Sequence, residues 1–263
     1  MKYIGIIILL FANIVLASEI PIAKYYNMEA PHISEEGDIA LLIGHRANIA
    51  LAWEDNLLGL DGALNLHLEA EYNFLNAFAL SFSRSSTRKI YNLGFKFNYL
   101  NLLFKSSDHL INSAFKTSIS LPNSAGYSKT VKVNFQLMNS AYLFDRIEFL
   151  LPLYFTINSN DLINVSSATD DHTFAVGSGL KIKIIEDLFL VCEFTYPIWG
   201  YRSYEYYSAN ETWIPSYSAS IQWKHYTHIF QLGISNTAGL NQEEFIGGGD
   251  NQLRLGFNIA LFF

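Results

Sequence analysis

Three ionisable side chains stand at alternate positions in the stretch LNLHLEAEY, which runs from Leu64 to Tyr72. They are His67, Glu69 and Glu71, and an imidazole beside two carboxylates has the chemistry to bind a metal ion or to transfer protons. Residues two apart on a strand lie about 6.5–7 Å from each other, so a single ion would need further ligands from neighbouring strands. We therefore predict a polar network here, with no metal, cofactor or catalytic group.

A second group of reactive side chains is the stretch TDDH, residues 169–172. Asp170, Asp171 and His172 would lie at the outer end of a strand, and outer-membrane hydrolases use surface histidines and acids. An enzyme with its active site on a surface loop is therefore one alternative. Nothing marks a serine nucleophile, however, and an acidic loop before a strand is usually solvated surface. We expect that the protein is not an enzyme.

The elements that carry these residues are β-strands, because apolar and polar residues alternate with a period of two. No segment has a convincing helical period, and no Pro/Gly/Ser-rich linker divides the chain. The predicted strands are residues 37–47, 60–72, 77–86, 89–100, 111–121, 129–139, 146–158, 171–184, 188–200, 215–224, 228–236 and 252–263.

One face of these strands is bulky, apolar and uncharged, and the other is small, polar or charged. A secreted β-sandwich would bury the bulky face, whereas a membrane barrel would turn it toward lipid. The strands are about 9–13 residues long, which suits a tilted crossing of a bilayer. Their apolar faces end in aromatic residues, as in the girdles of membrane barrels.

The connections also favour a barrel, because short and long ones alternate, apart from a short outer turn near Ser85–Arg88 and a long inner connection at Asn101–Leu110. The predicted fold is all-β: a closed antiparallel transmembrane β-barrel of about twelve strands in an up-and-down meander. The leucines of LNLHLEAEY would then face lipid, with His67, Glu69 and Glu71 inside.

Composition sets the limits of the remaining choices. The chain has 263 residues, of which 50% are hydrophobic and 16% charged, and its net charge of −7 argues against a nucleic-acid partner. Lys2 and the apolar run that follows it predict a cleaved secretory signal peptide at residues 1–17. An irregular N-terminal lead would occupy residues 18–36 and the barrel residues 37–263. The single cysteine, Cys192, excludes an internal disulfide.

Inward-facing charges form the predicted site. We expect that they lie in the periplasmic half of the interior, attract one another and narrow the barrel: His67, Glu69, Glu71, Lys96, Lys181 and Lys183. Arg46 and Arg254 would form a charge cluster at the outer mouth, facing lipopolysaccharide phosphates or an acid of an internal loop. The glycine-rich stretch IGGGDN, residues 246–251, is predicted to be a flexible loop.

Several stretches also resemble a known family: IGHR (43–46), LGLDGA (58–63), RSST (84–87), HIFQLGISNT (228–237) and LGFNIALFF (255–263). They look like a family of bacterial outer-membrane β-barrels catalogued as a domain of unknown function. The resemblance covers most of the chain from about Gly37. It implies the architecture and a location in the bacterial outer membrane, and it brings no activity. The terminal Phe263 looks like the end signal read by the outer-membrane insertion machinery.

These observations leave three functions. The favoured one is a small-solute channel or a structural barrel, with outer-membrane lipid, lipopolysaccharide and the insertion machinery as partners. The second is the surface-loop enzyme described above. The third is a ligand-binding or adhesion protein that uses the aromatic stretch YPIWGYRSYEYY, residues 196–207, together with Trp213.

Overall fold

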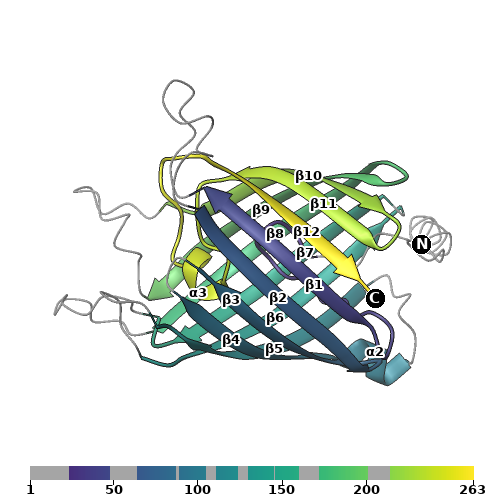
Figure 1. Ribbon diagram of the computed structural model, residues 1–263, viewed down its shortest axis with the longest axis horizontal. Helices are drawn as coiled ribbons and strands as arrows, with labels where there is room; N and C mark the ends of the chain where they lie inside the picture. Colours follow the sequence, from purple (N-terminus) through teal and green to yellow (C-terminus); the bar gives the residue numbers. More distant parts are fainter. Residues whose placement is uncertain are drawn as a thin grey trace, which may run out of the picture.

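The chain folds into a closed antiparallel β-barrel, and the computed structural model describes residues 24–47, 64–86, 89–104, 111–123, 130–144, 146–159, 172–200 and 214–263. Each strand pairs with the next along the sequence, and β1 pairs with β12 to close the barrel (Figure 1). The strands are β1 Ile39–Ala47, β2 Leu64–Leu75, β3 Phe78–Ser85, β4 Ile90–Asn98, β5 Ile111–Leu121, β6 Lys132–Leu143, β7 Ile147–Ile157, β8 His172–Ile185, β9 Leu188–Gly200, β10 Ser216–His225, β11 His228–Ser235 and β12 Arg254–Phe262. The predicted twelve-strand meander is confirmed.

The two ends of the barrel differ. At one, which we call the turn end, β1 begins and β12 finishes, and backbone hydrogen bonds join Ile39 to Phe263 at 2.9 and 3.0 Å. Residues 76–77, 186–187 and 226–227 connect strands there. The opposite loop end carries longer connections, including residues 236–253 between β11 and β12. A short helix, α3 (Gln242–Phe245), lies within that connection.

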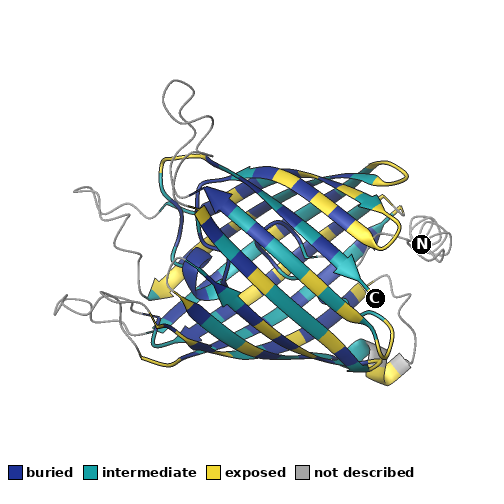
Figure 2. Ribbon diagram, in the orientation of Figure 1, coloured by how far each residue is buried: buried dark blue, intermediate teal, exposed yellow. Residues whose placement is uncertain are grey.

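The alternation along each strand sorts side chains between the outer surface and the interior (Figure 2). On β2, Leu68 is 44% exposed while His67 is only 2% exposed. Leu93, Leu151, Ile221 and Leu232 are likewise exposed on the outside. An apolar exterior suits lipid, and closure of the sheet pairs the backbone groups that hydrocarbon could not solvate.

Most strand limits agree with the predicted ones to within two residues, but β2 runs to Leu75 rather than to residue 72, and β6 spans Lys132–Leu143 rather than residues 129–139. The pair Asn139–Ser140 resembles a turn in sequence, yet in the sheet Asn139 accepts a hydrogen bond from the hydroxyl of Ser113 at 2.8 Å. Two short helices were not predicted: α2 (Tyr99–Phe104), at the turn end, and α3. Both are too short to show a helical period in sequence. Neither described helix is long and apolar enough to cross a membrane.

Two segments occupy the interior of the barrel. Residues 24–38, here called the lead, contain no helix or strand and contribute buried Tyr25, Tyr26 and Met28. Residues 236–253, here called the inner loop, contribute buried Phe245 and Ile246. The apolar side of the lead packs on apolar lumen residues of β5, β6, β7 and β9, namely Ala114, Met138, Leu150 and Val191.

Candidate functional site

The lead is attached to the barrel wall through a carboxylate on β9. Glu193 accepts hydrogen bonds from the backbone N–H groups of Asn27 and Met28, each at 2.9 Å, and from the hydroxyl of Ser218 at 2.6 Å. An irregular segment has no ladder partners for its backbone, so a buried carboxylate that accepts two N–H groups satisfies donors that would otherwise be costly.

Arg46 on β1 holds the same turn of the lead from the other side. Its guanidinium donates to the carbonyl of Tyr26 at 2.7 Å and to the side-chain oxygens of Asn27 and Asn258, each at 3.0 Å. It also lies 3.6 Å from the centre of the Tyr26 ring. Burial raises the pKa of the Tyr26 phenol to about 12, against the opposing effect of Arg46, so this residue stays neutral.

Small residues on β8 make room for the lead. A Cβ atom added to Gly179 would lie 2.7 Å from the ring of Tyr25, and one added to Gly177 would lie 2.9 Å from Cε of Met28. The glycines on the inward face of this strand therefore permit close contact between the lead and the wall.

The two arginines of the predicted mouth cluster bond to segments inside the barrel, and Arg254 has an acid of an internal loop as its partner, which was one of the two predicted partners. Arg46 and Arg254 lie on paired strands, with Arg46 opposite Gly256, but Arg46 is fully buried and bonds to the lead. Arg254 donates to both carboxylate oxygens of Asp250 in the inner loop, at 2.7 Å from Nη1 to Oδ1. Each arginine thus fastens a segment that fills the barrel.

The carboxylates of β2 belong to a cluster of charges in the middle of the lumen. Lys24 of the lead lies 2.9 Å from Glu69, and Lys116 of β5 lies 3.5 Å from Glu69 and also pairs with Glu29 of the lead. Nε2 of His67 lies 3.3 Å from Glu69. Burial raises the pKa of the Glu29 carboxyl, but the attraction of Lys116 and Lys24 outweighs it and the net shift is downward.

The other predicted lysines are divided between separate partners. Lys96 lies 3.0 Å from Glu71, whereas Lys181 lies 3.6 Å from Glu148 on β7. Lys183 is half-buried nearer the turn end, and its backbone N–H donates to the carbonyl of Arg146 at 2.7 Å. Five further charged residues inside the barrel were not predicted: Lys24, Glu29, Lys116, Glu148 and Glu193. Lys116, Glu148 and Glu193 lie at inward-facing positions of the alternating strands, so the alternation could have identified them. No local sequence pattern distinguishes Lys24 and Glu29.

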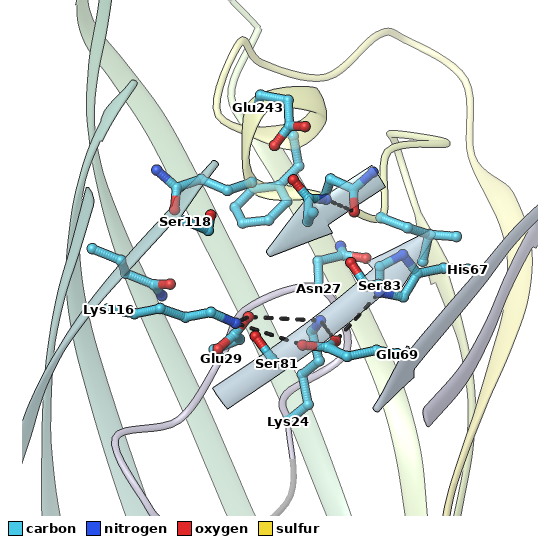
Figure 3. Close-up of a pocket in the computed structure, with 16 residues that line it drawn as sticks. Lys24, Asn27, Glu29, His67, Glu69, Ser81, Ser83, Lys116, Ser118 and Glu243 are labelled. Carbon is cyan, nitrogen blue, oxygen red and sulfur yellow. Dashed lines mark hydrogen bonds and ion pairs between the residues drawn. The ribbon is translucent and has the colours of Figure 1, made fainter. Parts of the chain in front are cut away.

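Two cavities run along the β1–β6 side of the barrel. The one nearer the loop end, the loop-side cavity, has about 40 Å³ of solvent-accessible space and is roofed by α3. The turn-side cavity has about 70 Å³ of solvent-accessible space and reaches Ser34 and Phe262 at the turn end. Lys24, Glu29 and Glu69 line both cavities, so the charge cluster separates two consecutive spaces. Figure 3 shows these three residues in the lining of the loop-side cavity.

The remaining candidates lie elsewhere. His172 at the loop end of β8 is half-buried against Phe155, with ring centres 6.2 Å apart, and Asp170 and Asp171 fall outside the described residues. Tyr196 and Trp199 are exposed on the outer surface of β9, and residues 201–213 are not described. Within the described chain, no group of three or more His, Cys, Asp or Glu side chains is placed to hold a metal ion.

The stretch IGGGDN contains no helix or strand, as predicted for a loop, but it is packed against neighbouring residues. In this stretch Ile246 is buried, and the N–H of Gly249 donates to the carbonyl of Ile214 at 2.9 Å. Gly248 has a φ of +105°, a conformation open to glycine, so these glycines shape a packed return toward β12.

Comparison with known proteins gives one family and several similar folds. The family model described as "Membrane bound beta barrel domain (DUF5777)" matches residues 23–263. No curated protein matches the chain. The KdgM porin, solved in complex with disordered oligogalacturonate, has a TM-score of 0.53 at 9% identity, covering 86% of this chain and 99% of that one.

Two further porin-like structures are equally similar. The NanC porin has a TM-score of 0.53 at 11% identity, covering 86% of this chain and 98% of that one. The COG4313 outer membrane channel from Pseudomonas putida F1 has a TM-score of 0.52 at 10% identity, covering 88% of this chain and 97% of that one. At such identities the likeness shows the fold alone.

Proposed function

The chain belongs to the family of membrane bound beta barrel domains (DUF5777), and from that premise we propose that it is a small-solute channel with an internal plug. The path runs beside the lead along the β1–β6 wall. We further propose that the barrel lies in the bacterial outer membrane after export by the signal peptide at residues 1–17, with the turn end in the periplasm and the loop end outside.

The observation that carries this proposal is the pair of cavities that share Lys24, Glu29 and Glu69. Tyr25 and Met28 of the lead pack against Gly179 and Gly177 of β8, and the two cavities lie beside the lead on the β1–β6 side. A continuous row of polar and charged groups along such a space favours water and small polar solutes over apolar ones.

The similar folds support the same class of function. The KdgM porin was solved with oligogalacturonate, and the Pseudomonas structure is titled a channel. A second candidate is a structural barrel that never opens, favoured by the hydrogen bonds that Glu193 accepts from the lead and that Arg46 donates to it. We propose no catalysis, because His172, the described member of the TDDH group, lies against the ring of Phe155 on the barrel's outer surface.

Single-channel recording on the full protein refolded into planar lipid bilayers tests the proposal. We expect discrete current steps, smaller than those of open porins because the lead and the inner loop occupy part of the lumen. A variant in which Arg46→Ala and Glu193→Ala release the lead should give larger steps. Silent membranes for both proteins, with insertion verified by protection from protease, would favour the structural barrel.

A further inference from the structure

The loop-side cavity is built as a compartment with a floor, a wall and a roof. The lead supplies the floor through Lys24 and Glu29, and the inner loop supplies the roof through Glu243 and Phe245. Figure 3 shows Glu243 above the space and Lys24, Glu29 and Glu69 below it. The wall consists of polar side chains from β2 to β6, namely His67, Glu69, Ser81, Ser83, Asn92, Lys116, Ser118 and Gln136.

Several buried atoms on this lining have no hydrogen-bond partner. His67 is 2% exposed, and its Nε2 faces Glu69 while its Nδ1 is unpaired. A nitrogen beside a carboxylate carries the proton, so Nδ1 is left as an acceptor. The Glu29 oxygen Oε2 is also an unpaired acceptor. Buried acceptors without partners are costly, and an occupant that donates hydrogen bonds would satisfy them.

The same lining also offers donors. Nε2 of Gln136, a residue that is 3% exposed, is unpaired, and the hydroxyls of Ser81 and Ser83 line the cavity. Hydroxyl groups on an occupant can donate to the acceptors and accept from these donors. The ring of Phe245 in the roof adds an apolar surface that suits the C–H face of a sugar ring.

Charge narrows the choice of occupant. The two lysines of the lining, Lys24 and Lys116, are already paired with Glu29 and Glu69. No cation is therefore left over for an anionic ligand, and the roof adds the carboxyl of Glu243. A carboxylate or phosphate placed here would find both lysines of the lining already paired with carboxylates.

We propose that the loop-side cavity is a binding site for a small, neutral, polyhydroxylated solute. The inference rests on the proposed channel function, since it names the class of solute that would occupy the path. His67 and Glu29 accept from the solute's hydroxyls, while Ser81, Ser83 and Gln136 donate to them.

The test measures the binding of three matched probes to the full protein in detergent micelles by saturation-transfer NMR. These are methyl glucoside, glucuronate and glucosamine, which are neutral, anionic and cationic forms of one ring. We expect saturable binding that is tightest for methyl glucoside. Ser81→Ala combined with Ser83→Ala should weaken it about five- to tenfold through the loss of two hydrogen bonds.

Ser140→Ala is the matched control, because Ser140 is a buried lumen serine of β6 that does not line the cavity. It should leave the affinity unchanged. No saturable binding of any probe, tighter binding of a charged probe, or equal loss in both serine variants would overturn the inference. Current steps without probe binding would overturn this inference and leave the channel proposal standing. Probe binding to a barrel that passes no current would overturn the channel proposal and leave the binding site standing.

Discussion

The carboxylate of Glu193 on β9 lies 2.9 Å from the backbone nitrogen of Met28, a residue 165 positions earlier in the chain. This contact, together with those of Asn27, joins the lead to the wall of a barrel that would otherwise hold a wider lumen. The free energy of lead docking, not the diameter of the barrel alone, therefore governs how much of the interior is open.

Glu193→Ala should release the lead. Two backbone N–H groups lose a charged acceptor, at a cost of about 2–3 kcal/mol, so the undocked population should rise roughly 30- to 150-fold. The measurement is the rate of protease cleavage within residues 24–34 of the folded barrel, because residues 35–37 are exposed even when the lead is docked. Glu186→Gln, at the exposed β8–β9 turn, is the control and should cleave at the wild-type rate. Equal rates for Glu193→Ala and wild type would show that this carboxylate does not hold the lead.

Gly179→Val should displace Tyr25. A Cβ at this position would lie 2.7 Å from the tyrosine ring, and overpacking of this kind costs about 1–3 kcal/mol. We expect a lower thermal unfolding midpoint by circular dichroism. Adding Tyr25→Ala should make the effect of Gly179→Val much smaller, because the clash is gone. Additive losses in the double variant would contradict the contact.

Charges at the shared cluster should control ion selectivity. Lys116→Met leaves Glu29 and Glu69 with less compensation and should make the channel several-fold more selective for cations, whereas Glu69→Gln should shift it toward anions. Reversal potentials in a salt gradient measure both. Lys89→Met, at an exposed position near the β3–β4 turn, should have no effect. Unchanged potentials in all three variants would place the current path elsewhere.

The inner loop should be held less firmly as the pH rises. Burial raises the pKa of Glu243 above its ordinary value of 4.5. The positive charge of Lys132 lowers this pKa, and the negative charge of Glu244 raises it, with a net shift upward. The docked loop therefore binds this proton more tightly than the released loop. Its contribution is complete below pH 4.5 and is lost as the pH passes through the raised pKa.

The comparison that tests this is wild type against Glu243→Gln, by thermal unfolding midpoint over a pH series. The neutral variant keeps the hydrogen-bonding shape without the ionisation. We expect the variant to gain stability relative to wild type as the pH increases. A constant difference at every pH would mean that Glu243 does not titrate with loop docking.

The sequence predicts the barrel well because the information for it is local. Alternation placed Leu68 outside and His67 inside, and the residues needed for that conclusion are neighbours. The same parity applied to every strand would also have selected Lys116, Glu148 and Glu193. It could not have shown their partners, because those partners lie in the lead or on other strands.

The contents of the lumen were harder to predict. The contact between Glu193 and Met28 spans 165 residues, and an irregular segment has no periodic signal. The glycines on β8 indicated only a small inward face, and the structure shows that Tyr25 and Met28 fill it. The sequence suggested an internal-loop acid as one partner for Arg46 and Arg254, and Asp250 is such a partner for Arg254, but no local pattern showed that Arg46 bonds to the lead.

The claim that solutes pass beside the lead along the β1–β6 wall has a direct measurement. With Cys192→Ser as background, Ser83→Cys places a thiol in the loop-side cavity, and Ser220→Cys places one on the opposite wall, outside both cavities. A charged thiol reagent added during single-channel recording should sharply reduce the current through Ser83→Cys and leave Ser220→Cys unchanged. Block at Ser220→Cys, with none at Ser83→Cys, would contradict the account.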